Sequence, residues 1–455
     1  MSEVSSSSQK RHVLVLGAGL AGLAAVRELR RDFYVTVVDA KEYFEFTSGI
    51  LRAYVKPEHW ETLVFPYQEV LEDRLKVTFK CGEVVALHSD LHCAEVRMIW
   101  GEELEEIEFH FCLIAAGCNF NQLSRFGISP WFPVIHERAR DGKWDLDERF
   151  LESRRRSILR EHQQLVDLHA RKASILVVGA GYQAVQWACE LNYFFPSLRV
   201  FLVDFMPRCL GPLPEDAAAY CEEYMRKHGI STQYNVKYDE NSEAFWHRVG
   251  LPDRADKIYV LSGAKHSNYF VDEVAQSQRG PGGGGWILIN KFLQVVTKTG
   301  ERWGEGAIFA VGDCASSSGE ASKWELPQLP KTGFPAEQQA IQASKNIKAL
   351  DRRWFAKRCC LGGLPMQHLC GPRYLRPTWF PWAAGIFAIS LGPDDGVLIV
   401  GAKYEKGSGR VYCRGAIAAA IKDLVEVTKV ASSKHEHWLS CTLWYCLHQW
   451  SSICS

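Results

Sequence analysis

Two glycine-rich turns and one Gly-Asp pair carry the residues best suited to bind a nucleotide. Gly17-Ala-Gly-Leu-Ala-Gly22 and Gly179-Ala-Gly-Tyr-Gln-Ala184 each follow an apolar run, and Gly312-Asp313 ends a third apolar run. Glycines at these spacings permit a tight turn, a close approach of the backbone to a pyrophosphate and close packing of the next helix. A helix that begins at such a turn directs its N–H groups and positive dipole end at the phosphates. The pattern therefore predicts that two dinucleotides bind to one chain.

The first turn lies between two apolar runs that we expect to be strands. Residues 13–16 precede it, and residues 35–38 follow a helix predicted over 20–31. Continuous apolar runs of this length are typical of buried parallel strands. Asp39 follows the second run, where a carboxylate accepts hydrogen bonds from a ribose. The alternative is that Asp39 merely ends a strand.

The second turn repeats this arrangement between residues 175–178 and 200–203. The third small residue of this turn is Ala184, and dinucleotide-binding turns of this type accept alanine there in place of glycine. Asp204 follows the second run and favours the free 2′-hydroxyl of NADH over a 2′-phosphate. Arg208 lies close enough in sequence to weaken that preference.

The third apolar run, over 307–311, comes only after the second unit has ended. The simplest topology inserts the second domain into the first, so that this run returns to the first sheet and brings Asp313 to the cofactor. Asp313 is then placed to accept hydrogen bonds from the ribitol of a flavin, so one dinucleotide is expected to be FAD. Residues 112–117 read as a further strand that runs into a turn of small residues.

These patterns predict an α/β protein with two nested Rossmann-like dinucleotide-binding domains plus a small α+β C-terminal domain. The expected divisions are a tail over 1–10, an FAD-binding domain over 11–172 and 290–350, an NAD(P)H-binding domain over 173–289, a C-terminal domain over 351–430 and an aromatic, cysteine-rich tail over 431–455.

Composition narrows the classes of function. The chain has 455 residues and a formal net charge of zero, so no general attraction to nucleic acid is expected. Fifteen cysteines without zinc-binding spacing suggest reduced thiols and no metal site. No signal peptide and no run of about 18 apolar residues is evident. We therefore expect a cytoplasmic protein, or one held peripherally on an intracellular membrane.

Together these motifs resemble the two-dinucleotide flavoproteins of the pyridine nucleotide-disulfide oxidoreductase superfamily. Over residues 11–430 the chain most resembles its type II NADH dehydrogenases and its apoptosis-inducing-factor-like, ferroptosis-suppressor-like branch. The resemblance implies that hydride passes from NAD(P)H, with NADH favoured, to FAD, and that electrons pass on to a quinone or another acceptor. A homodimer is also compatible with it.

The resemblance also implies roles for residues outside the glycine turns. The segment from Tyr43 to Arg52 implies that Arg52 contacts FAD, and Gly82-Glu-Val84 implies that the backbone of Val84 meets the adenine. Residues 329–346 resemble the helix that begins beneath the isoalloxazine. The full set expected at FAD is Gly17, Ala18, Gly19, Leu20, Ala21, Gly22, Asp39, Arg52, Val84, Gly117, Gly312 and Asp313, and the set expected at NAD(P)H is Gly179, Gly181, Ala184 and Asp204.

Three departures from the family pattern leave the acceptor open. No cysteine precedes Cys81, so the Cys-x4-Cys relay of disulfide reductases is absent. Gln186 stands where the family usually has Glu, and Phe334 stands where type II dehydrogenases have a quinone-site Gln. Glu190 and Gln338 remain as the candidate catalytic polar groups. The alternatives are a soluble diaphorase that uses a protein carrier or oxygen, or a slow-turnover redox sensor or interaction module.

Three other regions carry structural expectations. Residues 146–172 suggest an amphipathic helix, with Arg154-Arg-Arg156 on a solvated face. Residues 382–391 and 397–400 are expected to be strands, followed by a helix over 415–430. The aromatic tail over 438–455 is expected to be a short docking helix or, alternatively, a membrane-surface or partner contact.

Overall fold

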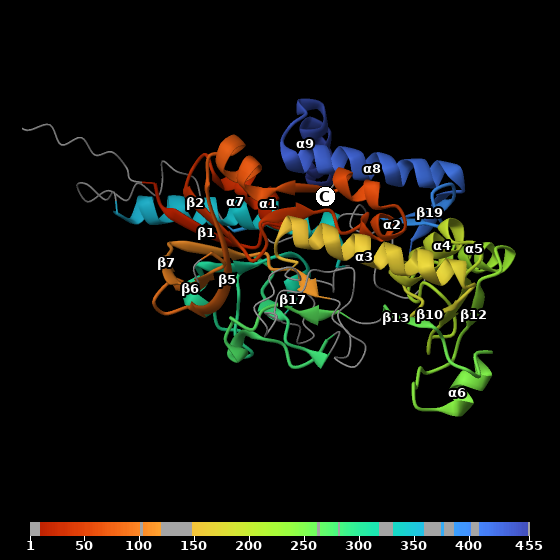
Figure 1. Ribbon diagram of the computed structural model, residues 1–455. Helices are drawn as coiled ribbons and strands as arrows, with labels where there is room; N and C mark the ends of the chain where they lie inside the picture. The colour runs from red at the N-terminus through yellow and green to blue at the C-terminus, as the bar shows by residue number, and fades with distance from the viewer. Residues whose placement is uncertain are drawn as a thin grey trace, which may run out of the picture. The chain divides into compact units, whose positions relative to one another are not determined.

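The computed structural model describes nine stretches of the chain (Figure 1). The chain forms two compact units. Unit 1 contains residues 1–42, 67–118 and 266–379, and unit 2 contains residues 43–66, 119–265 and 380–455. The domain boundaries expected from the sequence stay a prediction. The described residues are 10–100, 103–119, 148–261, 264–280, 283–317, 331–358, 375–376, 386–401 and 409–453.

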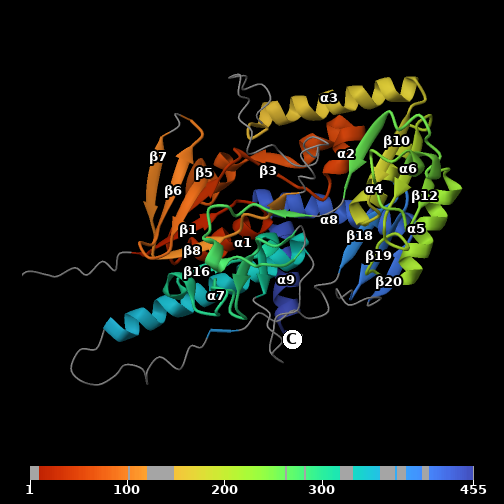
Figure 2. The ribbon, with the colours of Figure 1, turned by 90° about the horizontal axis from the view of Figure 1, so that it is seen from below.

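Unit 1 is built on a seven-stranded sheet in the order β16-β8-β1-β2-β5-β6-β7. The first five strands in this order pair in parallel, and the last three form an antiparallel meander, seen side by side in Figure 2. The predicted return to the first sheet is confirmed, because β16 pairs with β8. The strands are β1 (His12–Leu16), β2 (Tyr34–Asp39), β5 (Thr78–His88), β6 (Cys93–Met98), β7 (Leu104–Glu108), β8 (Phe111–Ile114) and β16 (Ile308–Ala310).

Two helices of unit 1 pack against each other, α1 (Leu20–Leu29) and α7 (Gly333–Arg358). Small residues allow close approaches at both helices: Gly22 of α1 packs against the backbone of Gly17, and Ala336 of α7 packs against Gly312. Strand β15 comes before β16 in the sequence and β17 comes after the turn that follows β16, and these two strands pair in parallel. The smaller elements are η2 (Glu69–Arg74), η4 (Glu273–Ala275), β15 (Ile287–Ile289), η6 (Trp303–Gly306), η7 (Gly312–Cys314) and β17 (Ala315–Ser317). Two short strands, β9 (Cys118–Asn119) and β14 (Lys265–His266), lie where the chain passes between the units.

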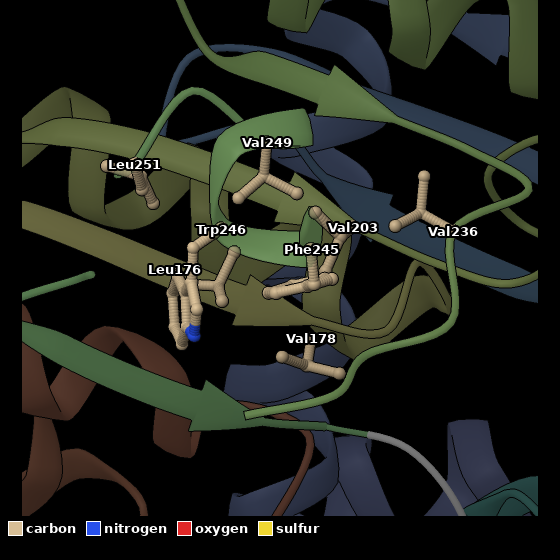
Figure 3. Close-up of a cluster of buried hydrophobic side chains, with 8 residues drawn as sticks. All are labelled: Leu176, Val178, Val203, Val236, Phe245, Trp246, Val249 and Leu251. Carbon is tan, nitrogen blue, oxygen red and sulfur yellow. The ribbon is translucent and has the colours of Figure 1, made fainter. Parts of the chain in front are cut away.

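Unit 2 contains a four-stranded parallel sheet in the order β12-β11-β10-β13. Phe245 and Trp246 of α6 pack on its core, with Leu176 and Val203 from the strands (Figure 3). The strands are β10 (Ser174–Val178), β11 (Arg199–Val203), β12 (Ser231–Gln233) and β13 (Lys257–Val260), and the helices are α4 (Tyr182–Phe194), α5 (Glu215–Lys227) and α6 (Glu243–Arg248).

The C-terminal part of unit 2 is a three-stranded antiparallel sheet covered by α8. The expected strands and helix are present, although residues 382–385 lie outside the described part of the chain. The tail forms a helix that packs on α8. The elements are β18 (Phe387–Ser390), β19 (Gly396–Val400), β20 (Arg410–Arg414), α8 (Ala416–Lys434) and α9 (Trp438–Ile453).

The N-terminal segment of unit 2 pairs β3 (Tyr43–Glu45) with β4 (Val64–Pro66) and lies with α2 (Ile50–Val55), η1 (Pro57–Thr62) and α3 (Leu151–Ala170). Helix α3 is the amphipathic helix that the sequence predicts.

The sequence predicts that Arg154-Arg-Arg156 lies on a solvated face, and this prediction is wrong for Arg154. The Arg154 side chain is 0% exposed, whereas Arg155 and Arg156 lie on the surface. Its Nε lies 2.9 Å from Glu45 Oε2, and its Nη1 lies 2.8 Å from Glu148 Oε2. A buried guanidinium requires such paired acceptors, and they explain why Arg154 points inward.

Candidate functional site

The first glycine turn has two closed positions and one open position. Gly17 has φ +99°, and a Cβ there would lie 2.4 Å from the carbonyl oxygen of Ala115. A Cβ on Gly22 would lie 1.9 Å from the carbonyl oxygen of Gly17, so neither position admits a side chain. A Cβ on Gly19 would meet nothing within 4 Å. This opening lies at the start of α1, where a phosphate needs room beside backbone N–H groups.

Asp39 ties the end of β2 to this turn. Its Oδ2 accepts a hydrogen bond from the Ala18 N–H at 2.7 Å, and its Oδ1 accepts one from the Lys41 N–H at 2.9 Å. Burial raises the pKa of Asp39, and the charge of Lys41 and the two backbone donors act in the opposite direction. Since a carboxylate has about four acceptor positions, two backbone bonds leave room for ribose hydroxyls.

The turn that follows β16 brings Asp313 to the same end of the sheet. Gly312 has φ +72°, and a Cβ there would lie 3.1 Å from the Ala336 Cβ. The Gly312 N–H donates to Gln339 Oε1 at 2.5 Å, which fixes the turn to α7. Burial raises the pKa of Asp313. The carboxyl ends of parallel strands are where α/β folds bind nucleotides.

Most residues expected at FAD therefore share the first sheet of unit 1. Val84 lies on β5, three residues beyond Cys81, which pairs with Asp39. Gly117 has φ +68° and lies three residues after the end of β8. The tight cradle at Gly17 and Gly22, the open Gly19 and the buried acids fit a dinucleotide such as FAD.

The second turn repeats this geometry in unit 2. Gly179 has φ +111°, and a Cβ on Gly181 would meet nothing within 4 Å. Asp204 Oδ2 accepts from the Ala180 N–H at 2.5 Å, as Asp39 does from Ala18. Ala184 is fully buried in the first turn of α4. The residues fit a second dinucleotide.

Arg208 is engaged away from Asp204. Its Nη2 lies 2.9 Å from the carbonyl oxygen of Leu213 and 3.4 Å from that of Gly211. Those bonds hold the guanidinium on its own loop, so the weakening of the NADH preference expected from Arg208 has no geometric support.

Arg52 and Glu190 both belong to unit 2 and pair with each other. Arg52 Nη2 lies 2.9 Å from Glu190 Oε1, and Arg52 Nη1 lies 3.1 Å from Asp423 Oδ1. Burial lowers the pKa of Arg52, but Glu190 and Asp423 outweigh it, and the net direction is upward. The contact of Arg52 with FAD stays a prediction. Gln338 lies half-buried on α7 of unit 1, so the two catalytic candidates lie in different units.

Gln186 belongs to a buried polar cluster that the sequence analysis missed. Its Oε1 accepts hydrogen bonds from Lys422 Nζ and from Ser390 Oγ, the latter at 3.1 Å. Lys422 Nζ also lies 2.6 Å from Ser390 Oγ. Burial lowers the pKa of Lys422 to about 8. No sequence signal marked Lys422, because a lysine within an amphipathic helix is usually on the surface.

Comparison with known proteins identifies the group to which these sites belong. A family model described as pyridine nucleotide-disulphide oxidoreductase matches residues 11–342. The chain belongs to this family. The resemblance found in the sequence, the fold class and the cofactors FAD and NAD(P)H are thereby confirmed.

Relatives of the same family include proteins named for different roles. Apoptosis-inducing factor homolog B of Dictyostelium discoideum is 23% identical over 421 residues, which cover 86% of this chain and 90% of that protein. A type II NADH:quinone oxidoreductase of Staphylococcus epidermidis is 24% identical over 76% of this chain and 83% of its own length. Ferroptosis suppressor protein 1 of Xenopus tropicalis is 24% identical over 68% of this chain and 75% of that protein.

Solved structures share the fold of this oxidoreductase. The sulfide:quinone oxidoreductase of Aquifex aeolicus matches with a TM-score of 0.65 at 17% identity, covering 93% of this chain and 92% of that one. NDH2 of Plasmodium falciparum in complex with NADH matches with a TM-score of 0.61 at 11% identity, covering 96% and 97%. The chain is thus a flavin-dependent NAD(P)H oxidoreductase. Across the described stretches, no helix has the length and apolar character needed to cross a bilayer.

Proposed function

We propose that this oxidoreductase uses NADH as donor and a quinone as acceptor. The observation that carries the proposal is the matched pair of turns, each with one open glycine and one aspartate bonded to its backbone. Two such turns are what a chain needs to bind FAD and NADH together. The relatives named type II NADH:quinone oxidoreductases support quinone as the acceptor.

The chain's own residues bind and orient the two nucleotides. In unit 1, the open Gly19 and the N-terminus of α1 would hold the FAD pyrophosphate, Asp39 its ribose and Asp313 its ribitol. Of the other expected contacts, Val84 lies on β5 and Gly117 follows β8 in the same sheet, whereas Arg52 belongs to unit 2. When bound, FAD would supply the redox chemistry, namely hydride acceptance from a nicotinamide and electron donation to an acceptor.

The preference for NADH follows from Asp204. Both of its oxygens accept backbone hydrogen bonds, from Ala180 at 2.5 Å and Met206 at 2.7 Å, so it is held as an acceptor beside the turn. A carboxylate in this place accepts from a 2′-hydroxyl and repels a 2′-phosphate. Arg208 is bound to its own loop, so its guanidinium is not directed at Asp204 to offset the repulsion.

Glu190 and Gln338 are proposed as polar groups that act on the reacting nucleotides. Glu190 is almost fully buried, and its partner Arg52 holds it in place. Gln186 is uncharged, whereas the family usually has a glutamate at this position. The charge of the neighbouring Lys422 is therefore not offset by residue 186, so the local charge is more positive than it would be with a glutamate there.

Anaerobic stopped-flow absorbance tests the function. We expect NADH to bleach the flavin band at about 450 nm, and a short-chain ubiquinone to restore it within the same experiment. Bleaching without recovery would exclude quinone and point to a carrier protein or oxygen. No bleaching by NADH or NADPH would favour the slow redox sensor.

We also propose that α9 makes a peripheral membrane contact. Trp438 and Leu439 are 74% and 63% exposed. Trp444, in contrast, docks on α8, where Lys429 Nζ lies 4.3 Å from its ring centroid. Interfacial tryptophans suit a membrane surface. The Trp438→Ser/Leu439→Ser double variant should no longer cosediment with anionic vesicles. The proposed homodimer is tested separately, by the elution volume of the protein in size-exclusion chromatography.

A further inference from the structure

A half-buried cation lies beside the turn that carries Asp313. The Nζ of Lys331 lies 3.5 Å from the centroid of the Trp286 ring and donates a hydrogen bond to the backbone oxygen of Asp313. Trp286 is fully buried and directly precedes β15, whose Ile287 pairs with Ala315 of β17. Strand pairing therefore fixes the indole next to the 312–314 turn, and the indole in turn fixes the ammonium.

The charge of Lys331 acts on the ionisation of the Asp313 carboxyl. Burial raises the pKa of the Asp313 carboxyl, and the charge of Lys331 acts against that rise. The Cys118 thiol lies 3.9 Å from Asp313 Oδ2. Burial raises the pKa of Cys118 well above its ordinary value, so the thiol faces the carboxylate as a neutral donor. Burial likewise raises the pKa of the adjacent Cys314 to about 11, so it adds no charge near neutral pH.

Lys331 has the properties of a preorganised group. It contacts Trp286 and the peptide oxygen of Asp313, and both belong to unit 1. It therefore holds its position through the protein itself, without needing a ligand. A fixed positive charge beside a buried carboxylate favours the ionised form, which accepts stronger hydrogen bonds than a neutral acid does.

We propose that Lys331 is a positioning residue of the FAD site: it fixes the 312–314 turn and supplies the charge that lets Asp313 accept hydrogen bonds from the flavin ribitol as a carboxylate. The inference rests on the proposed role of Asp313 at the ribitol. An ammonium that merely attracted the pyrophosphate would strengthen FAD binding equally at every pH. An ammonium that acts through Asp313 changes the pH at which FAD is lost.

The experiment measures FAD release from the holoprotein as a function of pH. Wild type, Lys331→Met, Lys331→Arg, Asp313→Asn and the Lys331→Met/Asp313→Asn double variant are incubated from about pH 5 to about pH 8, and the free flavin is measured by fluorescence after ultrafiltration. Circular dichroism at each pH restricts the comparison to folded protein. Methionine keeps the stem of Lys331 without its charge, and arginine keeps a charge that stacks on Trp286.

We expect the midpoint of FAD release to rise by about one pH unit in Lys331→Met, equivalent to about tenfold in affinity at a given acidic pH. Lys331→Arg should return the midpoint toward that of wild type. In the Asp313→Asn background, Lys331→Met should no longer move the midpoint.

Two failures are distinguishable. If Asp313→Asn retains FAD as wild type does, the role of Asp313 at the ribitol is wrong and the inference falls with it. If Asp313→Asn loses FAD but Lys331→Met leaves the midpoint unchanged, or weakens binding equally at every pH, only the role given to Lys331 is overturned.

Discussion

Replacing Arg154 with methionine tests the buried ion cluster of unit 2. Arg154 bonds Glu45 at 2.9 Å and Glu148 at 2.8 Å, and the side chains of Arg154 and Glu45 are both 0% exposed. The Trp60 indole N–H also donates to Glu45 at 3.1 Å. Methionine fills most of the space but leaves the Glu45 carboxylate buried without its cation.

The expected cost follows from that unpaired charge. Removal of one partner from a buried ion pair lowers the free energy of unfolding by about 3–5 kcal/mol. Arg156 provides the matched control, because it lies on the same helix and pairs with Glu152 at 3.2 Å while half of its side chain is exposed. An exposed helical pair of this kind contributes about 0.3–0.5 kcal/mol.

Urea unfolding and hydrogen exchange of α3 peptides measure the difference. A loss of about 3–5 kcal/mol speeds exchange through unfolding by about two to four orders of magnitude. Arg156→Met should stay within about threefold of wild type. If Arg154→Met costs no more than Arg156→Met, the buried cluster does not stabilise unit 2 and the reasoning fails. Glu45→Gln should restore part of the loss in the double variant, because the two groups are coupled.

The other predictions concern the nucleotide turns and Lys422. Gly19→Val should abolish FAD retention and leave the melting temperature of the apoprotein unchanged. Gly22→Ala should lower the melting temperature of the apoprotein, since its Cβ would lie 1.9 Å from the Gly17 oxygen. Equal melting temperatures for the two variants would contradict this reasoning. Asp204→Ala should raise the KM for NADH with FAD content unchanged, and unaltered NADH kinetics would count against the assignment. Because burial lowers the pKa of Lys422 to about 8, the unfolded chain binds more protons above that pH, and the free energy of unfolding of wild type should rise relative to Lys422→Met from about pH 8 to about pH 10; a constant difference would refute the lowered pKa.

The glycine turns could be predicted because their information is local. Each strand, turn, helix and aspartate lies within a short stretch, and Asp39 and Asp204 bond the turn that precedes them by little more than twenty residues. Their apolar runs also show that they are buried strands. The place of Asp313 needed one further inference, the return of β16 to the sheet, which the topology confirms.

The polar clusters could not be predicted because their partners lie far away along the chain. Glu45 is 109 residues from Arg154, and Gln186 is 236 residues from Lys422. From sequence, Arg154 belongs to a run of three charges and reads as surface. Only the tertiary structure shows which member of such a run meets buried acceptors.

The nested topology constrains how the protein can be made. The ribosome releases β1, β2, β5 and β8 first, but their sheet gains its edge strand only when β16 emerges, after the whole parallel sheet of unit 2 has been synthesised. Domains fold as they emerge from the ribosome, and long-range strand pairing is slow. The edge of β8 that pairs with β16 therefore stays unpaired until β16 has been synthesised. A nascent chain halted before residue 308 would also lack Asp313. Tight flavin capture is thus a late event in biogenesis, coupled to completion of the sheet.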